Sequence, residues 1–334
     1  MEKTEKIEKT EKIEKTEKVE RKINLKGFTS QYGTLCGLVG IVIIIAILKP
    51  KFLSVDNILN LLRQASINGL LAIGMTFVVL TGGIDLSVGS IVGASGMFAA
   101  LVARTETGLP WYLAVLVGLG VGLLLGTLNG VIISYLKVPA FIATLGTLSI
   151  ARGITYMASD ARPVPGLSEG FLKIGGGSVG PIPTPVIILA VVLGICFLLL
   201  YRCRYGRYVF ATGGNQMSAR VSGVKVKQII CSVYMISGLL AGLAGVILTS
   251  RVTSGLAQSG QNYETDAIAA AVIGGNSLAG GRGRLWGTIV GFLIIGVMNN
   301  GLDMMAVSSY WQLVIKGSII IIAVLLDSLN ETKS

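Results

Sequence analysis

The sequence predicts an all-α, polytopic membrane protein of about ten transmembrane helices, and three observations support this fold class. Apolar residues make up 52% of the 334 residues and charged residues only 13%, against roughly 25% charged residues in a soluble protein. The first 26 residues hold nine lysines or arginines and seven glutamates, which leaves 29 charged residues for the other 308. Several apolar runs are also long enough to cross a bilayer, since about 20 helical residues span roughly 30 Å.

The chain divides into a charged N-terminal tail, a membrane domain and a short C-terminal segment. Residues 1–32 form the predicted cytoplasmic tail, which begins with the repeat EKT-EKI-EKT-EKI-EKT-EKV. The apolar members of this repeat come every six residues and point in different directions on a helix, so they form no stripe for membrane binding. We expect a solvated tail, either disordered or helical. The membrane domain is predicted over 33–328, and 329–334 form a short cytoplasmic C-terminus.

Ten candidate spans are predicted near 33–48, 64–80, 88–103, 111–133, 140–157, 185–201, 228–249, 265–280, 285–301 and 310–327. The connection 202–227 carries six cations and no acid, which predicts that it is cytoplasmic. Because six spans precede this connection and four follow it, both termini are predicted on the same side. Trp111, Trp286 and Trp311 fall at span ends, where amphipathic rings prefer the headgroup level.

Several function classes are excluded by composition. The net charge of +11 comes from cations scattered between apolar runs, which suits the positive-inside rule better than a nucleic-acid groove. The chain has no histidine, and its four cysteines have no CxxC spacing, so no metal site is predicted. A membrane-embedded enzyme would need a nucleophile with its base, and no such pair is present.

The segment TGGIDLSVGS at 81–90 interrupts an apolar run. Gly82 and Gly83 weaken a helix, and Ser87 is placed to cap a new one. Asp85 is an acid near the membrane, where a central charge costs about 2.5–3.5 kcal/mol, so it should face protein, water or the interface. Two interpretations stay open: part of a polar pathway, or an interfacial turn whose carboxylate accepts backbone hydrogen bonds.

A second break, GGNSLAGGRGRLWGT at 274–288, resembles the first and suggests a weak internal repeat, although glycine-rich segments also match by chance. Its glycine pairs are Gly274, Gly275, Gly280 and Gly281. The lysine and hydroxyl residue of a P-loop do not follow these glycines, and no βαβ pattern surrounds them. If transport is driven by ATP, another polypeptide must therefore hydrolyse it.

Polar side chains inside the spans are the other pathway candidates. An asparagine there either hydrogen-bonds to a hydroxylated solute or ties one helix to its neighbour. Lys316 lies close enough to Tyr310 along a helix to snorkel toward the interface. Together with Asp85 and Ser87, the candidates are Asn68, Asn129, Asn299 and Asn300, with Arg152 and Lys316 as the cations.

The cytoplasmic run GRYVFATGGNQMSARVSGVKV, residues 206–226, predicts a loop, a short helix and a stop. Asn215 is placed to cap the helix, Ala219 and Val221 give it a partly apolar face, and Gly223 suits its C-terminus. Such a helix is a docking element for a soluble partner. The alternative is a basic loop that touches only anionic lipid.

These residues carry a resemblance to a known family over nearly all of the chain after residue 50. The sequence resembles the permease subunit of bacterial ATP-binding-cassette importers for simple sugars, and is most similar to the ribose permease type. The matching stretches are NGLLAIGMTFVVLTGGIDLSVGS (68–90), VPAFIATLGTLSIARG (138–153), GRYVFATGGN (206–215), YETDAIAAAVIGGNSLAGGRGRLWGT (263–288) and NNGLDMMAVSSYWQLVIKG (299–317).

The resemblance implies that 215–223 is the coupling helix that docks on a cytoplasmic ATPase subunit. The residues that it assigns to coupling are Arg207, Asn215, Gln216, Ala219, Arg220 and Gly223. Gln216 stands where the family often has Glu, so an acidic contact with the ATPase is not implied here. The chain itself needs no cofactor and is not an enzyme, because ATP and magnesium belong to the partner ATPase.

The resemblance also implies a homodimer or a pair of similar permeases, an extracytoplasmic sugar-binding protein and a multi-pass location in the lipid of the bacterial inner membrane. Transport would proceed by alternating access. Ribose is the expected solute, with galactose, xylose and autoinducer-type furanoses as alternatives. An ion-coupled secondary transporter is the other alternative, although acids deep in the spans are scarce.

Overall fold

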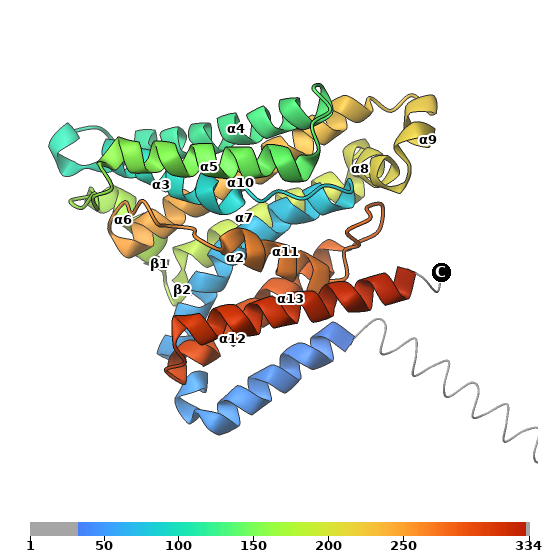
Figure 1. Ribbon diagram of the computed structural model, residues 1–334. Helices are drawn as coiled ribbons and strands as arrows, with labels where there is room; N and C mark the ends of the chain where they lie inside the picture. The colour runs from blue at the N-terminus through green and yellow to red at the C-terminus, as the bar shows by residue number, and fades with distance from the viewer. Residues whose placement is uncertain (1–32, 332–334) are drawn as a thin grey trace, which may run out of the picture.

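The computed structural model describes residues 33–331, whereas the predicted tail 1–32 and residues 332–334 lie outside the described residues. Helices form nearly all of the described part (Figure 1), which confirms the predicted helical fold class. The elements are the helix Gly33–Leu48, η1 (Pro50–Leu53), α2 (Val55–Leu80), α3 (Val88–Ala103), η2 (Thr105–Thr107), α4 (Trp111–Ser134), α5 (Ala140–Ser159), α6 (Glu169–Gly176), β1 (Ser178–Val179), β2 (Ile182–Pro183), α7 (Thr184–Phe197), η3 (Leu198–Arg202), α8 (Arg204–Gly214), α9 (Gln216–Val221), α10 (Val226–Val252), α11 (Tyr263–Ile273), α12 (Leu285–Met304) and α13 (Ser309–Glu331).

Most of the helices run between two opposite ends of the molecule. In Figure 1 the right-hand end gathers α8, α9, the α4–α5 connection and the C-terminal end of α13. The left-hand end gathers α6, the antiparallel pair β1–β2 and the connection between α12 and α13. Helix α13 continues to Glu331, beyond the predicted domain boundary at 328.

Six helices in the described part are long and apolar enough to cross a membrane: α2, α4, α5, α7 with η3, α10 and α12. The helix Gly33–Leu48 and α3 are apolar but shorter, and α13 adds a further 23 residues. Trp111, Trp286 and Trp311 lie in the first turns of α4, α12 and α13, as predicted.

The predicted span at 265–280 differs from the structure. Helix α11 has 11 residues and stops at Ile273, so it covers only about 16 Å. Gly275 adopts a φ of +81°, a left-handed conformation that ends a helix. Residues 274–284 are irregular, and before α11 the backbone at Gly260 and Asn262 also has positive φ. The segment is therefore a half-length helix between two irregular stretches.

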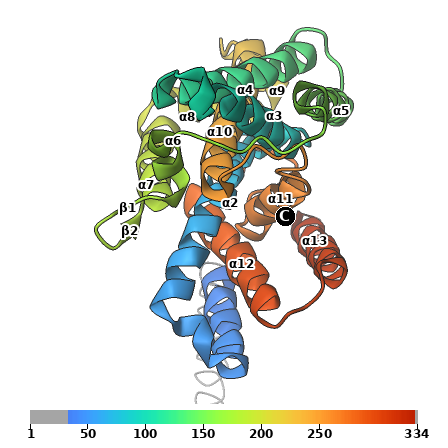
Figure 2. The ribbon, with the colours of Figure 1, turned by 90° about the vertical axis from the view of Figure 1, so that its left-hand side faces the viewer.

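Helix α10 packs against α4 along a line of glycines. Gly118, Gly122, Gly126 and Gly130 repeat every four residues on α4, and a Cβ atom at Gly126 would lie 2.9 Å from the Cα atom of Gly238 on α10. Small residues let two helix backbones approach closely, which is how helices pack in a bilayer, where burial of apolar surface supplies no driving force. Figure 2 shows α2 and α10 between α3, α4 and α5 on one side and α12 and the helix Gly33–Leu48 on the other.

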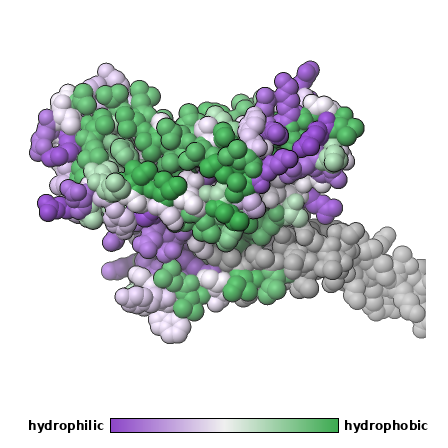
Figure 3. Space-filling model, turned by 45° about the horizontal axis from the view of Figure 1, so that its top comes forward, coloured by the Kyte–Doolittle hydropathy of each residue, from purple (hydrophilic) through white to green (hydrophobic). Residues whose placement is uncertain are grey.

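The outer surface carries a belt of exposed apolar side chains. Large hydrophobic residues are exposed on the outward faces of α4 and α5, among them Leu124, Phe141, Ile142 and Ile150. Figure 3 shows hydrophobic residues across the middle of the molecule and hydrophilic residues gathered at both ends. A soluble monomer rarely exposes so continuous an apolar surface, so the belt agrees with a protein whose outer faces lie in an apolar environment.

Candidate functional site

The first glycine break holds a buried carboxylate. Helix α2 ends at Leu80 and α3 begins at Val88, and Asp85 in between is fully buried. Its Oδ1 atom accepts hydrogen bonds from the Ser87 backbone nitrogen at 3.0 Å and from the Ser87 hydroxyl at 2.6 Å, and its Oδ2 atom accepts one from the Ser237 hydroxyl at 2.9 Å. Ser87 occupies the N-cap position of α3, as predicted, but its side chain makes no capping bond: its hydroxyl donates to Asp85 instead.

This hydrogen-bond network continues into α4 and α5. The Asn129 side-chain amide donates to the Ser87 hydroxyl at 2.8 Å, and the Thr147 hydroxyl donates to the Asn129 carbonyl oxygen at 2.6 Å. All of these residues are buried. Three of the predicted pathway residues, Asp85, Ser87 and Asn129, therefore form one cluster that links the first break to α4, α5 and α10. A buried hydrogen-bond network contributes most to stability when each of its polar groups has a partner.

A second polar cluster lies between α11, α12 and α13. Lys316 Nζ lies 3.0 Å from Asp266 Oδ2 and forms an ion pair with it, and the Asn299 amide donates to the same oxygen at 3.2 Å. The side chains of Lys316 and Asp266 are only 17% and 5% exposed. Lys316 is therefore paired inside the protein and does not snorkel as predicted. The Asn299 carbonyl oxygen is buried without a hydrogen-bond partner among the described residues.

Sequence reasoning missed Asp266, which lies in the first turn of α11. The only signal was an acid just before the apolar run AIAAAVI. The partner that identifies its role, Lys316, is 50 residues away in the chain.

A pocket of about 180 Å³ opens beside this ion pair. Its polar lining offers amide, phenol, carboxylate and ammonium groups, which can together donate and accept several hydrogen bonds. The side chains that supply them come from α11, the residues just before it and α13, namely Gln261, Asn262, Tyr263, Asp266, Gln312 and Lys316. Such a lining suits a small polyhydroxylated solute.

The remaining polar candidates lie apart from both clusters. The Asn300 and Asn57 side chains exchange two hydrogen bonds, at 2.9 and 3.0 Å, and tie α12 to α2. Arg152 donates from Nη1 to the carbonyl oxygens of Ala257 and Ser259 at 2.7 and 2.9 Å, which holds the irregular stretch before α11. Asn68 is buried within α2 and belongs to neither cluster.

The two glycine breaks, which are almost 200 residues apart, meet in space. The Gly281 backbone nitrogen donates to the Leu80 carbonyl oxygen at 2.9 Å, and a Cβ atom at Gly280 would lie 2.7 Å from the Gly82 nitrogen. The end of α8 joins them, since a Cβ atom at Gly281 would lie 2.6 Å from the Gly214 Cα atom. We call Gly82, Gly213, Gly214, Gly280 and Gly281 the glycine junction.

Of the glycines predicted at the breaks, Gly82, Gly275, Gly280 and Gly281 have positive φ angles between 71° and 88°. Gly83 and Gly274 do not, but each allows a close approach. A Cβ atom at Gly83 would lie 2.5 Å from the Tyr234 hydroxyl, and one at Gly274 would lie 2.5 Å from the Gly287 carbonyl carbon.

The predicted short helix after Asn215 is confirmed as α9. The Asn215 side-chain oxygen accepts a hydrogen bond from the Ser218 nitrogen at 2.9 Å, and Gly223 after the helix has a φ of +84°. The preceding residues were predicted as a loop, but they form α8, which contains Arg207. Ala219 is buried, whereas Met217 and Val221 are 67% and 83% exposed, so α9 presents an apolar outer face.

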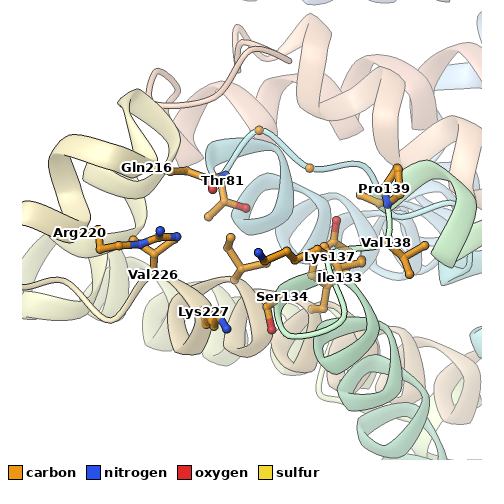
Figure 4. A pocket seen from close by; sticks show the side chains of 15 residues that line it. Thr81, Ile133, Ser134, Lys137, Val138, Pro139, Gln216, Arg220, Val226 and Lys227 are labelled. Carbon is orange, nitrogen blue, oxygen red and sulfur yellow. The ribbon is translucent and has the colours of Figure 1, made fainter.

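A second pocket, of about 360 Å³, lies between α9, the α4–α5 connection, the start of α10 and the first glycine break (Figure 4). Lys137, Arg220 and Lys227 line it together with Thr81, Gln216 and Tyr234. None of the described residues that line it is acidic. The pocket therefore has a positive character and adjoins the helix predicted to dock a partner.

Residues 57–324 match a family model described as the permease component of a branched-chain amino acid transport system. The chain is 48% identical to the ribose import permease protein RbsC of Bacillus subtilis over 92% of this chain and 95% of that protein. It is 41% identical to the RbsC protein of Escherichia coli K12 over 93% and 98%. It is also 44% identical to the D-allose transport system permease protein AlsC of the same strain, over 92% and 95%. No solved structure matches the chain.

Proposed function

The chain belongs to the family of transport-system permease components, and from this membership we propose that it is the membrane-spanning permease subunit of an ATP-binding-cassette importer for ribose. The observation that supports ribose is the 41–48% identity to ribose import permeases from three bacterial species, each over more than nine-tenths of this chain. D-allose is the second candidate solute, because the D-allose permease is 44% identical. Galactoside and xylose permeases are more distant, at 37% and 34%.

The energy source in this proposal is a separate cytoplasmic ATPase, which uses ATP and magnesium. In this proposal the permease itself is not an enzyme and carries no cofactor; its glycine-rich segments lack the lysine and hydroxyl residue that hold phosphate and magnesium in a P-loop. Helix α9 is the element that docks on the ATPase. Its exposed Met217 and Val221 supply the apolar contact, and Arg207, Gln216 and Arg220 supply polar ones.

The proposed topology has ten membrane segments, of which α11 is a half-length one, and both termini are cytoplasmic. Two observations support it. The basic connection 202–227 and the C-terminal end of α13 share one end of the molecule (Figure 1). The opposite end gathers the connections that follow α3, α5 and α12, as alternating crossings require. The outer end would receive the solute from an extracytoplasmic sugar-binding protein.

The solute path in this proposal passes the pocket beside Asp266 and Lys316. Amide and carboxylate groups there can bind sugar hydroxyls. Asn299, a sequence-predicted candidate, has a buried oxygen that bonds to none of the described residues and lies next to this ion pair. Asp85, Ser87 and Asn129 bond to one another and hold the first glycine break against α4 and α10. Asn68 and Asn300 remain secondary candidates for residues that line the solute path. Two copies of the chain would enclose the path in the lipid of the bacterial inner membrane.

Transport would follow alternating access. ATP binding would draw the ATPase subunits together, and α9 would move with them. Helix α8, which precedes α9, contacts both glycine breaks through the glycine junction. A displacement of α9 would therefore be passed by α8 to the end of α2 and to the irregular stretch 274–284 that follows α11. The solute would need only weak binding in the path, because tight binding would slow its release.

Uptake by proteoliposomes tests the proposal. The permease is reconstituted with its ATPase and sugar-binding protein, and labelled ribose is offered with excess unlabelled D-allose or without it. We expect ATP-dependent uptake that survives a protonophore and is blocked poorly by D-allose. Strong competition and transport of D-allose instead would favour the second solute. Loss of uptake with the protonophore while ATP stays high would show an ion-coupled transporter.

A further inference from the structure

The cationic pocket between α9 and the α4–α5 connection has no role of its own in the proposed transport cycle, although two of its lining residues, Gln216 and Arg220, belong to the helix proposed to dock on the ATPase. Three cations from three different elements converge on it: Lys137 from the α4–α5 connection, Arg220 from α9 and Lys227 from the first turn of α10 (Figure 4). Among residues 33–331 the ion pairs are Arg104–Glu106 and Lys316–Asp266, so none of the three cations is neutralised there. Three like charges around one pocket repel one another, and a bound anion would offset this repulsion.

All three cations are exposed, and local structure marks two of their positions. Lys227 Nζ lies 5.5 Å from the centroid of the Tyr135 ring, a cation–π arrangement that restrains the side chain. Lys137 has a φ of +61°, in the left-handed region that residues other than glycine rarely adopt. Strained backbone of this kind gathers at functional sites, where the surrounding structure holds it. Arg220 lies in the last turn of α9 and lines the pocket.

We propose that this pocket is a binding site for a phosphate group on the cytoplasmic side of the permease. An arginine with two lysines matches a phosphate better than a carboxylate, because a carboxylate has only two oxygens and one negative charge. A phosphate group has further oxygens, so the ammonium groups can contact those that the guanidinium leaves free. The volume of about 360 Å³ exceeds the size of a bare ion and is in the range of small-ligand sites. Ile133, Val138 and Ile230 line the rest of the pocket and would contact the uncharged part of the ligand.

Two sources can supply this chemistry: a soluble phosphomonoester, such as a phosphorylated sugar, or the headgroup of an anionic phospholipid in the inner leaflet. In either case the ligand would connect α9 to Thr81, Gly82 and Gly83 of the first glycine break, which line the same pocket. It would therefore favour the conformation in which α9 lies against that break, and would bind the other conformation less tightly. The site would regulate coupling without taking part in solute binding.

Titration calorimetry on the full-length permease in non-ionic detergent tests the proposal. One arm titrates inorganic phosphate, and a second arm titrates short-chain phosphatidylglycerol, with short-chain phosphatidylcholine as its reference. We expect saturable binding in at least one arm, and the tighter ligand identifies the source. Lys137→Gln and Lys227→Gln should each weaken binding about tenfold or more, since each removes a charge-assisted hydrogen bond.

Arg204→Gln is the matched control, because Arg204 is an exposed cation on the same side at the start of α8 and does not line the pocket. It should leave the affinity within about twofold of the wild type. Two pocket variants keep the test valid if one of them proves unstable on heating. Absence of saturable binding in both arms, or an equal loss with Arg204→Gln, would overturn the proposal. The assay needs neither sugar nor ATPase, so its failure is separate from failure of the proposed transport function.

Discussion

Single polar residues determine how the helices of this protein hold together. Asp85 accepts three hydrogen bonds from serine groups, and no described cation forms an ion pair with it. Asp266 instead has an ion pair with Lys316. Removing a group on which several buried donors depend leaves those donors unsatisfied, which costs about 1–3 kcal/mol for each of them. The two acids therefore lead to different expectations.

Asp85→Leu should lower the free energy of unfolding by at least about 2 kcal/mol, because it leaves the Ser87 and Ser237 donors without an acceptor. Asp85→Asn keeps one acceptor oxygen and should lower the free energy of unfolding by a smaller amount. Thermal unfolding of the purified permease in detergent measures both changes. Asp160→Asn is the control, since Asp160 is exposed and asparagine tolerates its left-handed backbone. A leucine variant as stable as the wild type would mean that the network does not hold the break.

Lys316→Met should destabilise the protein by about 3–5 kcal/mol, because it leaves the Asp266 carboxylate buried without its cation. The double variant Lys316→Met with Asp266→Asn removes both charges and should recover most of that loss. The melting temperature reports the effect of each variant on stability, and sugar uptake reports its effect on transport. A double variant that is stable but inactive would support a solute contact at this ion pair. If the double variant were no more stable than Lys316→Met, the ion pair would not be the cause.

The two acids also show what the sequence can predict about a site. An acid between two apolar runs is rare, so Asp85 stands out in the sequence, and its location at a break between helices was predicted. Its partners were only partly predicted, because Ser237 lies on α10, far along the chain. Asp266 was missed because its meaning depends on Lys316 and Asn299. No local pattern relates α11 to α13.

At the scale of the helices, glycine determines where segments end and how closely they approach. The positions of the apolar runs predicted most helices, since hydrophobicity and length are local properties. The end of α11 was predicted seven residues too late, at 280 where the structure has Ile273. The pair Gly274–Gly275 ends the helix, and its influence was underestimated because glycine is also common inside membrane helices. Helix α8 was missed because it is short and polar.

Gly213→Ala should disturb the glycine junction. Its Cβ atom would collide with the Leu80 carbonyl oxygen and lie 2.5 Å from the Gly281 nitrogen, and overpacking of this kind costs about 1–3 kcal/mol. We expect a lower melting temperature and slower uptake. Gly214→Ala is the matched control within the same junction, because a Cβ atom there meets no described atom within 4 Å. Equal effects of the two substitutions would mean that the close contact of Gly213 with Leu80 and Gly281 is not the cause.

Met217→Asp and Val221→Asp should weaken docking of the ATPase by placing a charge on the exposed apolar face of α9. Co-purification with the ATPase and ATP-driven uptake should both fall, while the melting temperature of the isolated permease stays unchanged. Val179→Asp, which alters an exposed valine at the opposite end of the molecule, should leave co-purification unchanged. Ala219→Asp is a less specific test, since Ala219 is buried and its replacement would also disturb packing. Unaltered co-purification in both α9 variants would place the docking face elsewhere.

At the scale of the whole molecule, the exposed belt of apolar side chains and the polar ends agree with the membrane location expected from composition. The arrangement of connections at two opposite ends follows from the order of the apolar runs and from their number. Only the similarity of their motifs indicated in the sequence that the two glycine breaks are related, and this signal was weak. Contacts such as Gly281 with Leu80 depend on how helices from both halves of the chain pack.

The isolated permease should not hydrolyse ATP, because its glycine-rich segments lack the residues that hold the nucleotide. Phosphate release by the purified chain should equal that of detergent buffer without protein. It should rise above this background only after a separate ATPase subunit is added. An ATPase subunit assayed alone gives the reference for stimulation. Turnover by the permease alone that survives further purification would contradict the division of labour between the two subunits.

The shortness of α11 has a consequence for how the protein is made. The translocon releases a nascent segment into lipid when it is long and apolar, and about 20 residues are needed. The 11 residues of α11, which include buried Asp266, do not meet this requirement. We therefore expect the segment to reach its final position only after α12 and α13 have been made, when Lys316 is available to pair with Asp266. A chain truncated before α13 should accordingly be less stable in the membrane and more readily degraded.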